Sequence, residues 1–353
     1  MVCPIQSNLS VYVKTTETCN LNCFHCFTSG INGAKIYFDP VATANWVNQL
    51  YDGTKICHFE YHGGEPMLAK TEDLFEFYNR VQSVWGVRGS FGITTNLTYK
   101  LTDDRLDFFS RVMTGKRIGT SWDPTIRFAN EKQEKLWEDN VRFLVDQGFI
   151  LKAFVSLSKD VVNRSPREMI DYLRGLGITE ISWERITGNG NALLYGEKLY
   201  PTNAALQDFF MRAYEECYDI REEFEDVFME TVYNKFEKGL LHQGTFCRDC
   251  EQKLFTINAD GTIAGCPNAA PTDHYGNIKQ SVEDVINSKG RQKVIIDEQV
   301  IRDPRCYSCP VFAYCHSDCH QLEWQGDVCP APKTLMMELL NGTNNKADRS
   351  LQL

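Results

Sequence analysis

The stretch Thr18-Cys19-Asn20-Leu21-Asn22-Cys23-Phe24-His25-Cys26-Phe27 decides how this chain is interpreted. Its three cysteines are spaced C-x3-C-x2-C. Three thiolates can hold three irons of a four-iron, four-sulfur (4Fe-4S) cluster, whose complete ligation by protein takes four. One iron then stays open, as a metal centre that performs chemistry requires. A zinc site with three cysteine ligands, or thiols that merely pack in the core, would also account for the spacing.

A second pattern, Gly63-Gly64-Glu65-Pro66, follows the strand expected at residues 55–61. Glycines let the backbone approach another group closely, and proline suits the first position of a helix. The Glu65 carboxylate can accept hydrogen bonds from an ammonium group. An ordinary strand-to-helix turn would by itself explain the two glycines and the proline.

Composition indicates a soluble globular protein, because 42% of the 353 residues are hydrophobic and 24% are charged. No run of about 18 apolar residues could span a membrane, and the N-terminus lacks the features of a signal peptide. We therefore expect a cytoplasmic protein with no membrane partner. The net charge of −10 disfavours a nucleic-acid partner. In a reducing compartment the 14 cysteines indicate metal ligands rather than disulfides.

Strand and helix patterns alternate along the first two thirds of the chain. We expect strands at 8–16, 55–61, 90–95, 117–122, 149–157 and 179–186, with helices between them and a long helix after the last strand. Short connections predict a parallel sheet with right-handed crossovers. Six units are too few for a closed eight-stranded barrel, so the fold class is α/β with a partial (β/α)6 TIM-type barrel. Its site should lie at the carboxyl ends of the strands.

Together the two motifs resemble those of the radical S-adenosylmethionine (SAM) superfamily. The resemblance implies that the amino and carboxylate groups of SAM chelate the open iron. An electron from the cluster then cleaves SAM to methionine and a 5′-deoxyadenosyl radical, which abstracts a hydrogen atom. The ligands of this cluster would be Cys19, Cys23 and Cys26. Gly63, Gly64 and Glu65 would hold the methionine amino group of SAM.

Other site residues follow from family position alone. The backbone at His25, where the family usually has an aromatic residue, would contact the adenine. Asn96 and Ser121 would lie near the methionine or ribose of SAM. The segment Ser121-Trp122-Asp123-Pro124 resembles a Ser-Leu-Asp-Gly segment of relatives that act on peptides. Asp123 is therefore the candidate catalytic residue, binding substrate or taking up a proton; an Asp-Pro turn that caps the next helix is the alternative.

A second group of cysteines fills the C-terminal part of the chain. It comprises Cys247-x2-Cys250, a Gly-x4-Cys element that ends at Cys266, and a run that begins at Cys306. Residues 254–257 and 262–264 flank Asn258-Ala259-Asp260-Gly261, which predicts a β-hairpin. Eight thiolates suffice for two fully ligated clusters, or for two zinc sites.

This order of cysteines resembles the SPASM domain, which carries auxiliary iron–sulfur clusters in peptide-modifying relatives. The resemblance assigns one auxiliary cluster to Cys247, Cys250, Cys266 and Cys319. It assigns the other to Cys306, Cys309, Cys315 and Cys329. We expect a radical SAM barrel at 1–220, a helical bridge at 221–245, the SPASM domain at 246–333, and a short helix with a flexible tail at 334–353. Cys57 and Cys217 are expected to be core thiols, and Cys3 has no assigned role.

The resemblance implies an oxidoreductase that matures a ribosomally synthesised peptide. The product would be a crosslink, either a carbon–carbon bond of the cyclophane type or a thioether, with one electron lost to the auxiliary clusters. The implied cofactors are SAM and three 4Fe-4S clusters. The implied partners are a precursor peptide and an electron donor such as flavodoxin or ferredoxin. Because no winged-helix module precedes the first strand, leader recognition would fall to the SPASM region, a sheet edge or a separate leader-binding protein.

Three other functions stay open. Sulfatase maturases, which form formylglycine, place an aspartate directly after the cysteine of the Gly-x4-Cys element as proton acceptor, where this chain has Pro267. Peptide epimerisation needs a hydrogen-donating thiol in the cavity. A non-catalytic iron–sulfur carrier or zinc scaffold would cleave no SAM.

Overall fold

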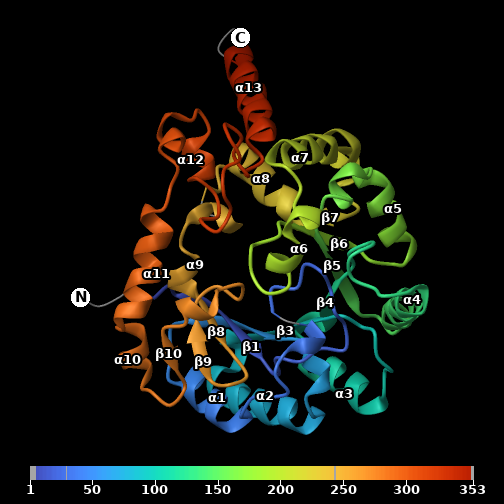
Figure 1. Cartoon of the computed structure of the whole chain (residues 1–353), viewed down its shortest axis with the longest axis vertical. Helices are drawn as coiled ribbons and strands as arrows, with labels where there is room; N and C mark the ends of the chain where they lie inside the picture. The colour runs from blue at the N-terminus through green and yellow to red at the C-terminus, as the bar shows by residue number, and fades with distance from the viewer. Residues whose placement is uncertain (1–4, 29, 242–243, 351–353) are drawn as a thin grey trace.

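The computed structural model describes residues 5–28, 30–241 and 244–350. Six parallel strands follow one another in sequence order, and each is separated from the next by a helix or helical turn (Figure 1). The strands are β1 (Asn8–Lys14), β2 (Ile56–His62), β3 (Gly89–Thr95), β4 (Arg117–Ser121), β5 (Ile150–Ser156) and β6 (Glu180–Glu184). The helices are α1 (Pro40–Asn48), α2 (Thr71–Trp85), α3 (Asp103–Val112), α4 (Glu131–Asp146) and α5 (Pro166–Gly175). The predicted partial (β/α)6 barrel is confirmed.

Local sequence explains why these elements form. The apolar side chains of β1 alternate, so that Leu9, Val11 and Val13 are buried in the core. Helix α1 begins after Asp39, whose carboxylate accepts hydrogen bonds from the backbone of Val41 and Ala42. One helix that we expected from Pro66 begins instead with a short 3-10 turn, Pro66–Leu68, and α2 itself starts at Thr71.

Two further elements extend the barrel beyond the sequence expectation. Helix α6 (Ala192–Leu199) precedes the expected long helix, α7 (Asn203–Cys217). The segment expected to be a helical bridge contains a short seventh strand, β7 (Glu225–Asp226), before α8 (Val227–Glu237). Strand β7 pairs in parallel with β6. Two residues are too few for a strand pattern to be recognised in sequence.

The C-terminal part continues the same sheet. The predicted hairpin is confirmed as β8 (Leu254–Ile257) and β9 (Thr262–Ala264), and β9 also pairs with β10 (Gly276–Asn277). Strand β8 pairs in parallel with β1, which places Phe255 opposite Val11. The sheet order is therefore β10-β9-β8-β1-β2-β3-β4-β5-β6-β7. The remaining helices of this part are α9 (Cys250–Lys253), α10 (Val282–Ile286), α11 (Lys289–Val300) and α12 (Phe312–Cys315).

Helix α13 (Lys333–Ser350) corrects the expectation of one or two helical turns followed by a flexible tail. Leu335 and Met336, in its first turn, are fully buried. This part of α13 contacts α7 and α8, and the rest projects from the body of the molecule (Figure 1). Packing of the first turn against the core offsets the free-energy cost of helix nucleation. The asparagine-rich sequence that follows has low helix propensity, so it did not predict the remaining turns. No helix among the described residues is long and apolar enough to cross a membrane.

Candidate active site

A cavity of about 770 Å³ opens at the carboxyl ends of the barrel strands. The three cysteines Cys19, Cys23 and Cys26 line it together with Gly63, Gly64 and Glu65. The site predicted at the carboxyl ends of the strands is therefore found there, because the loop after β1 and the turn after β2 face the same cavity. The volume lies within the range of natural small-molecule pockets.

The cysteine loop is held by segments that follow two other strands. After β4, the carbonyl oxygen of Ile126 accepts a hydrogen bond from the Phe24 backbone (3.1 Å). After β6, Asn191 donates from its backbone to the Cys26 carbonyl (2.8 Å) and from its side chain to the Cys23 carbonyl (3.1 Å). Gly190 lies so close that a Cβ there would sit 1.9 Å from the Thr28 carbonyl oxygen. The loop is thus fixed in place by the chain itself.

The electrostatic state of the cysteine thiols fits metal ligation. Burial raises the pKa of Cys19 to about 12 and that of Cys23 to about 11. Each of the two values is raised further by the neighbouring cysteines of the loop. Such thiols would stay protonated at neutral pH without a compensating cation, and an iron cluster would supply one. The donor set and the adjoining cavity therefore fit an open cluster.

The Gly-Gly-Glu turn packs against the chain that leads into the cysteine loop. The backbone of Gly64 donates to the Thr16 carbonyl (2.8 Å), and that of Glu65 donates to the Thr18 carbonyl (2.9 Å). A Cβ at Gly63 would lie 2.3 Å from the Thr16 oxygen, and one at Gly64 would lie 2.0 Å from the Thr18 oxygen. The glycines therefore serve a close contact within the chain, and their approach to a ligand remains a prediction.

Glu65 is 1% exposed and is bound by three protein donors. Its carboxylate accepts from the Met67 backbone (3.0 Å), the Thr95 hydroxyl (2.7 Å) and the Asn96 backbone (2.8 Å). Burial raises the pKa of Glu65 to about 7 although these bonds oppose the rise. An ammonium group at the cavity wall would stabilise the carboxylate, which keeps the predicted contact with the amino group of SAM chemically reasonable.

The other predicted SAM contacts surround the same cavity. Asn96 lies at the end of β3, and its amide donates to Asn20 (2.7 Å) and to the Cys19 sulfur (3.5 Å). Ser121 ends β4 and lines the cavity, as does His25. The structure brings all three to the cavity that the cysteines line, and their contacts with SAM remain predictions.

Asp123 lies behind the cavity wall rather than on it. It is fully buried, and its carboxylate accepts hydrogen bonds from the Arg127 guanidinium (2.6 Å) and the Ser156 backbone. The His25 imidazole lies 3.3 Å from the same carboxylate. Burial opposes ionisation, but Arg127 and His25 outweigh it and hold the pKa of Asp123 far below its usual range. This geometry fits an anchor for the segment after β4 better than a group that gains and loses protons.

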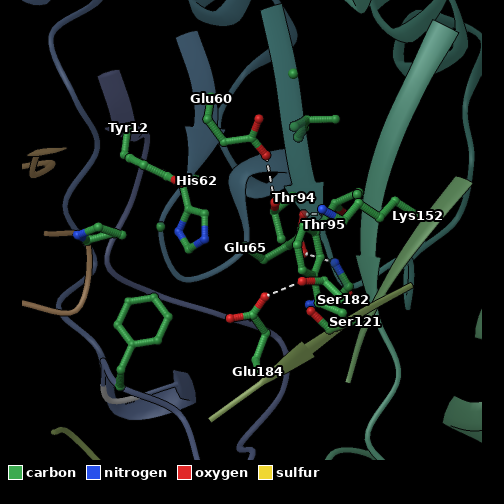
Figure 2. A pocket seen from close by; sticks show the side chains of 18 of the residues that line it. Tyr12, Glu60, His62, Glu65, Thr94, Thr95, Ser121, Lys152, Ser182 and Glu184 are labelled. Atoms are coloured by element: carbon green, nitrogen blue, oxygen red, sulfur yellow. Dashed lines mark hydrogen bonds between the residues drawn. The ribbon is translucent and has the colours of Figure 1, made fainter. Parts of the chain in front are cut away.

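Several polar side chains in the cavity were not singled out from the sequence. Figure 2 shows them pointing inward from neighbouring strands. Each of them stands on the side of a strand that faces the cavity, where every second residue of the strand points inward. They are Tyr12, Glu60, His62, Lys152, Ser182 and Glu184. Charged residues within otherwise apolar strands were the available signal. Sequence alone did not reveal which face turns inward.

The first predicted set of SPASM cysteines comes together in the structure. Burial raises the pKa of Cys250, and the thiols of Cys266 and Cys319 lie close enough to raise it further. Cys319 also raises the pKa of Cys266. The side chain of Cys247 lies outside the described residues. Three members of the set implied by the resemblance are therefore neighbours.

The second predicted set also comes together. Burial, Asp318 and the nearby thiols of Cys329 and Cys306 raise the pKa of Cys315. Burial raises the pKa of Cys329, and Cys309 adds to the rise. The proximity of these thiols agrees with the crossed sets that the resemblance implies, and their assignment to two clusters remains a prediction.

Among the described side chains, no three histidine, cysteine, aspartate or glutamate groups converge tightly enough to hold a single metal ion. Two described cysteines stand outside the proposed ligand sets. Cys57 and Cys217 are buried in the core and do not line the reaction cavity. Cys3 lies outside the described residues.

The barrel and the cysteine-rich part meet at a buried ion pair. Arg185, which follows β6, donates to both carboxylate oxygens of Asp318, and one of these bonds measures 3.0 Å. The two side chains are 5% and 1% exposed. Asp318 directly precedes Cys319, and Arg185 also lines a second cavity of about 580 Å³ between the two parts. The rim of the barrel is therefore tied to a predicted cluster ligand.

Comparison with protein families supports the C-terminal assignment. Residues 247–310 match the model of SPASM, described as an iron-sulfur cluster-binding domain. The predicted ligands Cys315, Cys319 and Cys329 lie beyond the matched segment. None of the curated proteins matches this sequence.

Solved structures share the fold over nearly the whole chain. The structure of anSMEcpe with bound AdoMet and Cp18Cys peptide has a TM-score of 0.76 at 16% identity, covering 96% of this chain and 99% of that one. SuiB of Streptococcus suis bound to S-adenosylmethionine has a TM-score of 0.63 at 15% identity, covering 93% and 78%. SuiB bound to its precursor peptide SuiA has a TM-score of 0.62 at 14% identity, covering 93% and 77%. This chain thus has the fold of radical SAM enzymes with a C-terminal SPASM domain, as its cysteine motifs predict.

Proposed function

We propose that this chain is a radical SAM oxidoreductase that matures a peptide. One observation carries the proposal: the cysteine loop and the Gly-Gly-Glu turn face one cavity, with polar side chains from other strands completing its wall. A purely structural cluster would need neither an open ligand position nor an adjoining cavity of this size.

The proposed cofactors are SAM and three 4Fe-4S clusters. Cys19, Cys23 and Cys26 would hold the first cluster, and the two SPASM cysteine sets would hold the other two. When bound, the first cluster and SAM supply a radical that abstracts hydrogen from a substrate. The chain would contribute the turn at 63–65 to orient SAM, and the cavity to enclose the reacting atoms.

We infer that the product is a crosslink within the peptide, made as a carbon–carbon or thioether bond. Two fully ligated auxiliary clusters suit this chemistry, because closing a bond after hydrogen abstraction releases an electron that a cluster can accept. The position of Cys319, one of the proposed cluster ligands, supports the inference, since Arg185 at the cavity rim pairs with the adjacent Asp318. SuiB and anSMEcpe, which have this fold, were solved with peptides bound.

The proposed partners are a precursor peptide, a flavodoxin or ferredoxin as electron donor, and a separate leader-binding protein. We also propose the domain boundaries given by the sequence, with a barrel at 1–220, a bridge at 221–245, a SPASM domain at 246–333 and a C-terminal segment at 334–353. Formylglycine formation is less well supported, because Pro267 lines the cavity and has no group that takes a proton. Epimerisation is disfavoured because neither Cys57 nor Cys217 lines the cavity.

Co-expression with candidate precursor peptides, such as any short peptide encoded beside the gene, followed by mass spectrometry, tests the proposed reaction. A crosslink removes the mass of two hydrogen atoms from the peptide, whereas epimerisation leaves the mass unchanged. A Cys19→Ala variant is the matched control and should leave the peptide unmodified. An unchanged mass with inverted stereochemistry, or formylglycine in place of a crosslink, would replace the proposed reaction by its rival.

A further inference from the structure

Crosslinking releases a proton that some group in the cavity must accept. The two positions that the family resemblance points to, Asp123 and Pro267, offer no such proton acceptor. Pro267 lines the cavity but binds no proton. Asp123 is fully buried, does not line the cavity, and is held ionised by Arg127. The acceptor therefore has to be found among the side chains that face the cavity.

Several titratable groups on the cavity wall are poor proton acceptors, either because they are already paired or because of their pKa. Glu65 is bound by three protein donors, and Glu180 pairs with Arg117 at the far end of β6. Burial raises the pKa of Tyr12, which keeps its phenol neutral and unable to accept. Burial lowers the pKa of His62 to about 4, which makes its imidazole a weak base.

Glu184 differs from these groups in position and in contacts. It is the last residue of β6, at the rim of the cavity, opposite Ser156 of β5. Figure 2 shows that its side chain turns into the cavity, whose walls surround it while leaving it accessible from the cavity. The Ser182 hydroxyl donates to its carboxylate at 2.8 Å. Among the described residues, Ser182 is the one hydrogen-bond donor to this carboxylate. The other lone pairs of the carboxylate can therefore accept a hydrogen bond or a proton from a substrate.

We propose that Glu184 is the catalytic residue that accepts the proton during bond formation. This inference rests on the proposed function. After hydrogen abstraction, the substrate carbon radical bonds to a second substrate atom, whose bond to hydrogen breaks. The proton passes to the Glu184 carboxylate, and the electron passes to an oxidised iron–sulfur cluster of the SPASM domain. The new bond to the substrate carbon thus forms as the bond to hydrogen breaks, the proton goes to Glu184, and the electron goes to the cluster.

The surroundings of Glu184 suit this role. Burial by the cavity walls raises its pKa, so the carboxylate binds a proton more readily than an exposed glutamate does. Lys152 and Arg185 oppose that rise and favour the ionised form that must receive the proton, whereas Asp123 adds to it. Glu184 is also adjacent to Arg185, whose guanidinium pairs with Asp318 beside Cys319. Proton and electron therefore leave the cavity on the same side.

The test compares Glu184→Gln with Glu60→Gln. Glu60 also lines the cavity and accepts a hydrogen bond from Thr94 (2.6 Å), but it stands on β2, before the strand end. Each purified enzyme, with its iron content measured, receives SAM, dithionite and a uniformly deuterated form of the precursor peptide that the wild type modifies in the co-expression experiment. Three quantities are followed: 5′-deoxyadenosine, its deuterium content, and crosslinked peptide.

We expect Glu184→Gln to form deuterated 5′-deoxyadenosine at the wild-type rate, while the crosslinked peptide falls by about a hundredfold or more. Formate should restore part of the product in Glu184→Ala, because it returns a carboxylate to the site. Glu60→Gln should lose much less crosslinking than Glu184→Gln, because the Glu60 carboxylate is already bound by Thr94 and His58. Deuterium transfer without product separates this role from a purely structural one.

Three results would overturn the proposal. A wild-type yield of crosslink from Glu184→Gln would show that another group takes the proton. Loss of deuterium transfer in Glu184→Gln, with wild-type iron content, would make Glu184 a substrate-binding residue instead. Equal losses in Glu184→Gln and Glu60→Gln would remove the assignment to one carboxylate. If the wild type itself made no product, the proposed function would fail first, and this inference with it.

Discussion

Replacing Gly64 by alanine tests whether the Gly-Gly-Glu turn is fixed by its contact with the cysteine loop. The added Cβ would lie 2.0 Å from the Thr18 carbonyl oxygen, so the turn and that backbone must separate. Separation breaks the bonds from Gly64 to Thr16 and from Glu65 to Thr18. Each is worth about 1 kcal/mol, and overpacking costs about 1–3 kcal/mol, for a total loss of about 3–5 kcal/mol.

The assay is urea unfolding followed by tryptophan fluorescence, together with iron content and SAM binding. Gly175→Ala is the matched control, because a Cβ there meets nothing within 4 Å and alanine favours the helix that this residue ends. Gly64→Ala should also bind SAM at least tenfold more weakly, since Glu65 moves with the turn. A free energy of unfolding within about 0.5 kcal/mol of the wild type would refute this account of the glycines.

Three shorter predictions follow. Arg185→Met should lower the free energy of unfolding by about 3–5 kcal/mol, because the buried Asp318 carboxylate loses the positive charge of its Arg185 partner. The double change with Asp318→Leu should recover part of this loss, and a loss as large as that of Arg185→Met alone would contradict the pairing. Burial raises the pKa of Asp226 to about 7. The stability that its protonated form contributes is therefore complete below about pH 4 and is lost as pH rises through about 7. Between about pH 6 and pH 8, the urea midpoint of Asp226→Asn should change less than that of the wild type. Cys57→Ala should keep the wild-type iron content, because Cys57 is 3% exposed in the core; a loss of iron would make it a ligand.

The hairpin and the order of the strands were predictable because their signals are local. Asn258-Ala259-Asp260-Gly261 sits between two short apolar runs, and the observed strands β8 and β9 end and begin at the residues expected. The pairing of β8 with β1 was not predictable, since it joins residues more than two hundred positions apart. Register over such a distance depends on packing that a single sequence does not encode locally.

The position of the cysteine loop was predictable, and the remaining side chains of the cavity were less so. The cysteine spacing singled out Cys19, Cys23 and Cys26, and the structure brings all three to one cavity, while their ligation of a cluster remains a prediction. The position of Asp123 behind the wall could not be read from its motif, because its burial depends on the long-range contact with Ser156. Glu184 gave no motif at all, and only its inward position on β6 distinguishes it (Figure 2).

Formation of 5′-deoxyadenosine tests the central claim most directly. The protein is reconstituted anaerobically with iron and sulfide, then given dithionite and SAM. We predict about twelve irons per chain from the ligand count, together with 5′-deoxyadenosine from the wild type and none from Cys19→Ala, Cys23→Ala or Cys26→Ala. Wild-type protein with its full iron content that cleaves no SAM would contradict the radical mechanism and leave an iron–sulfur carrier or scaffold as the better account.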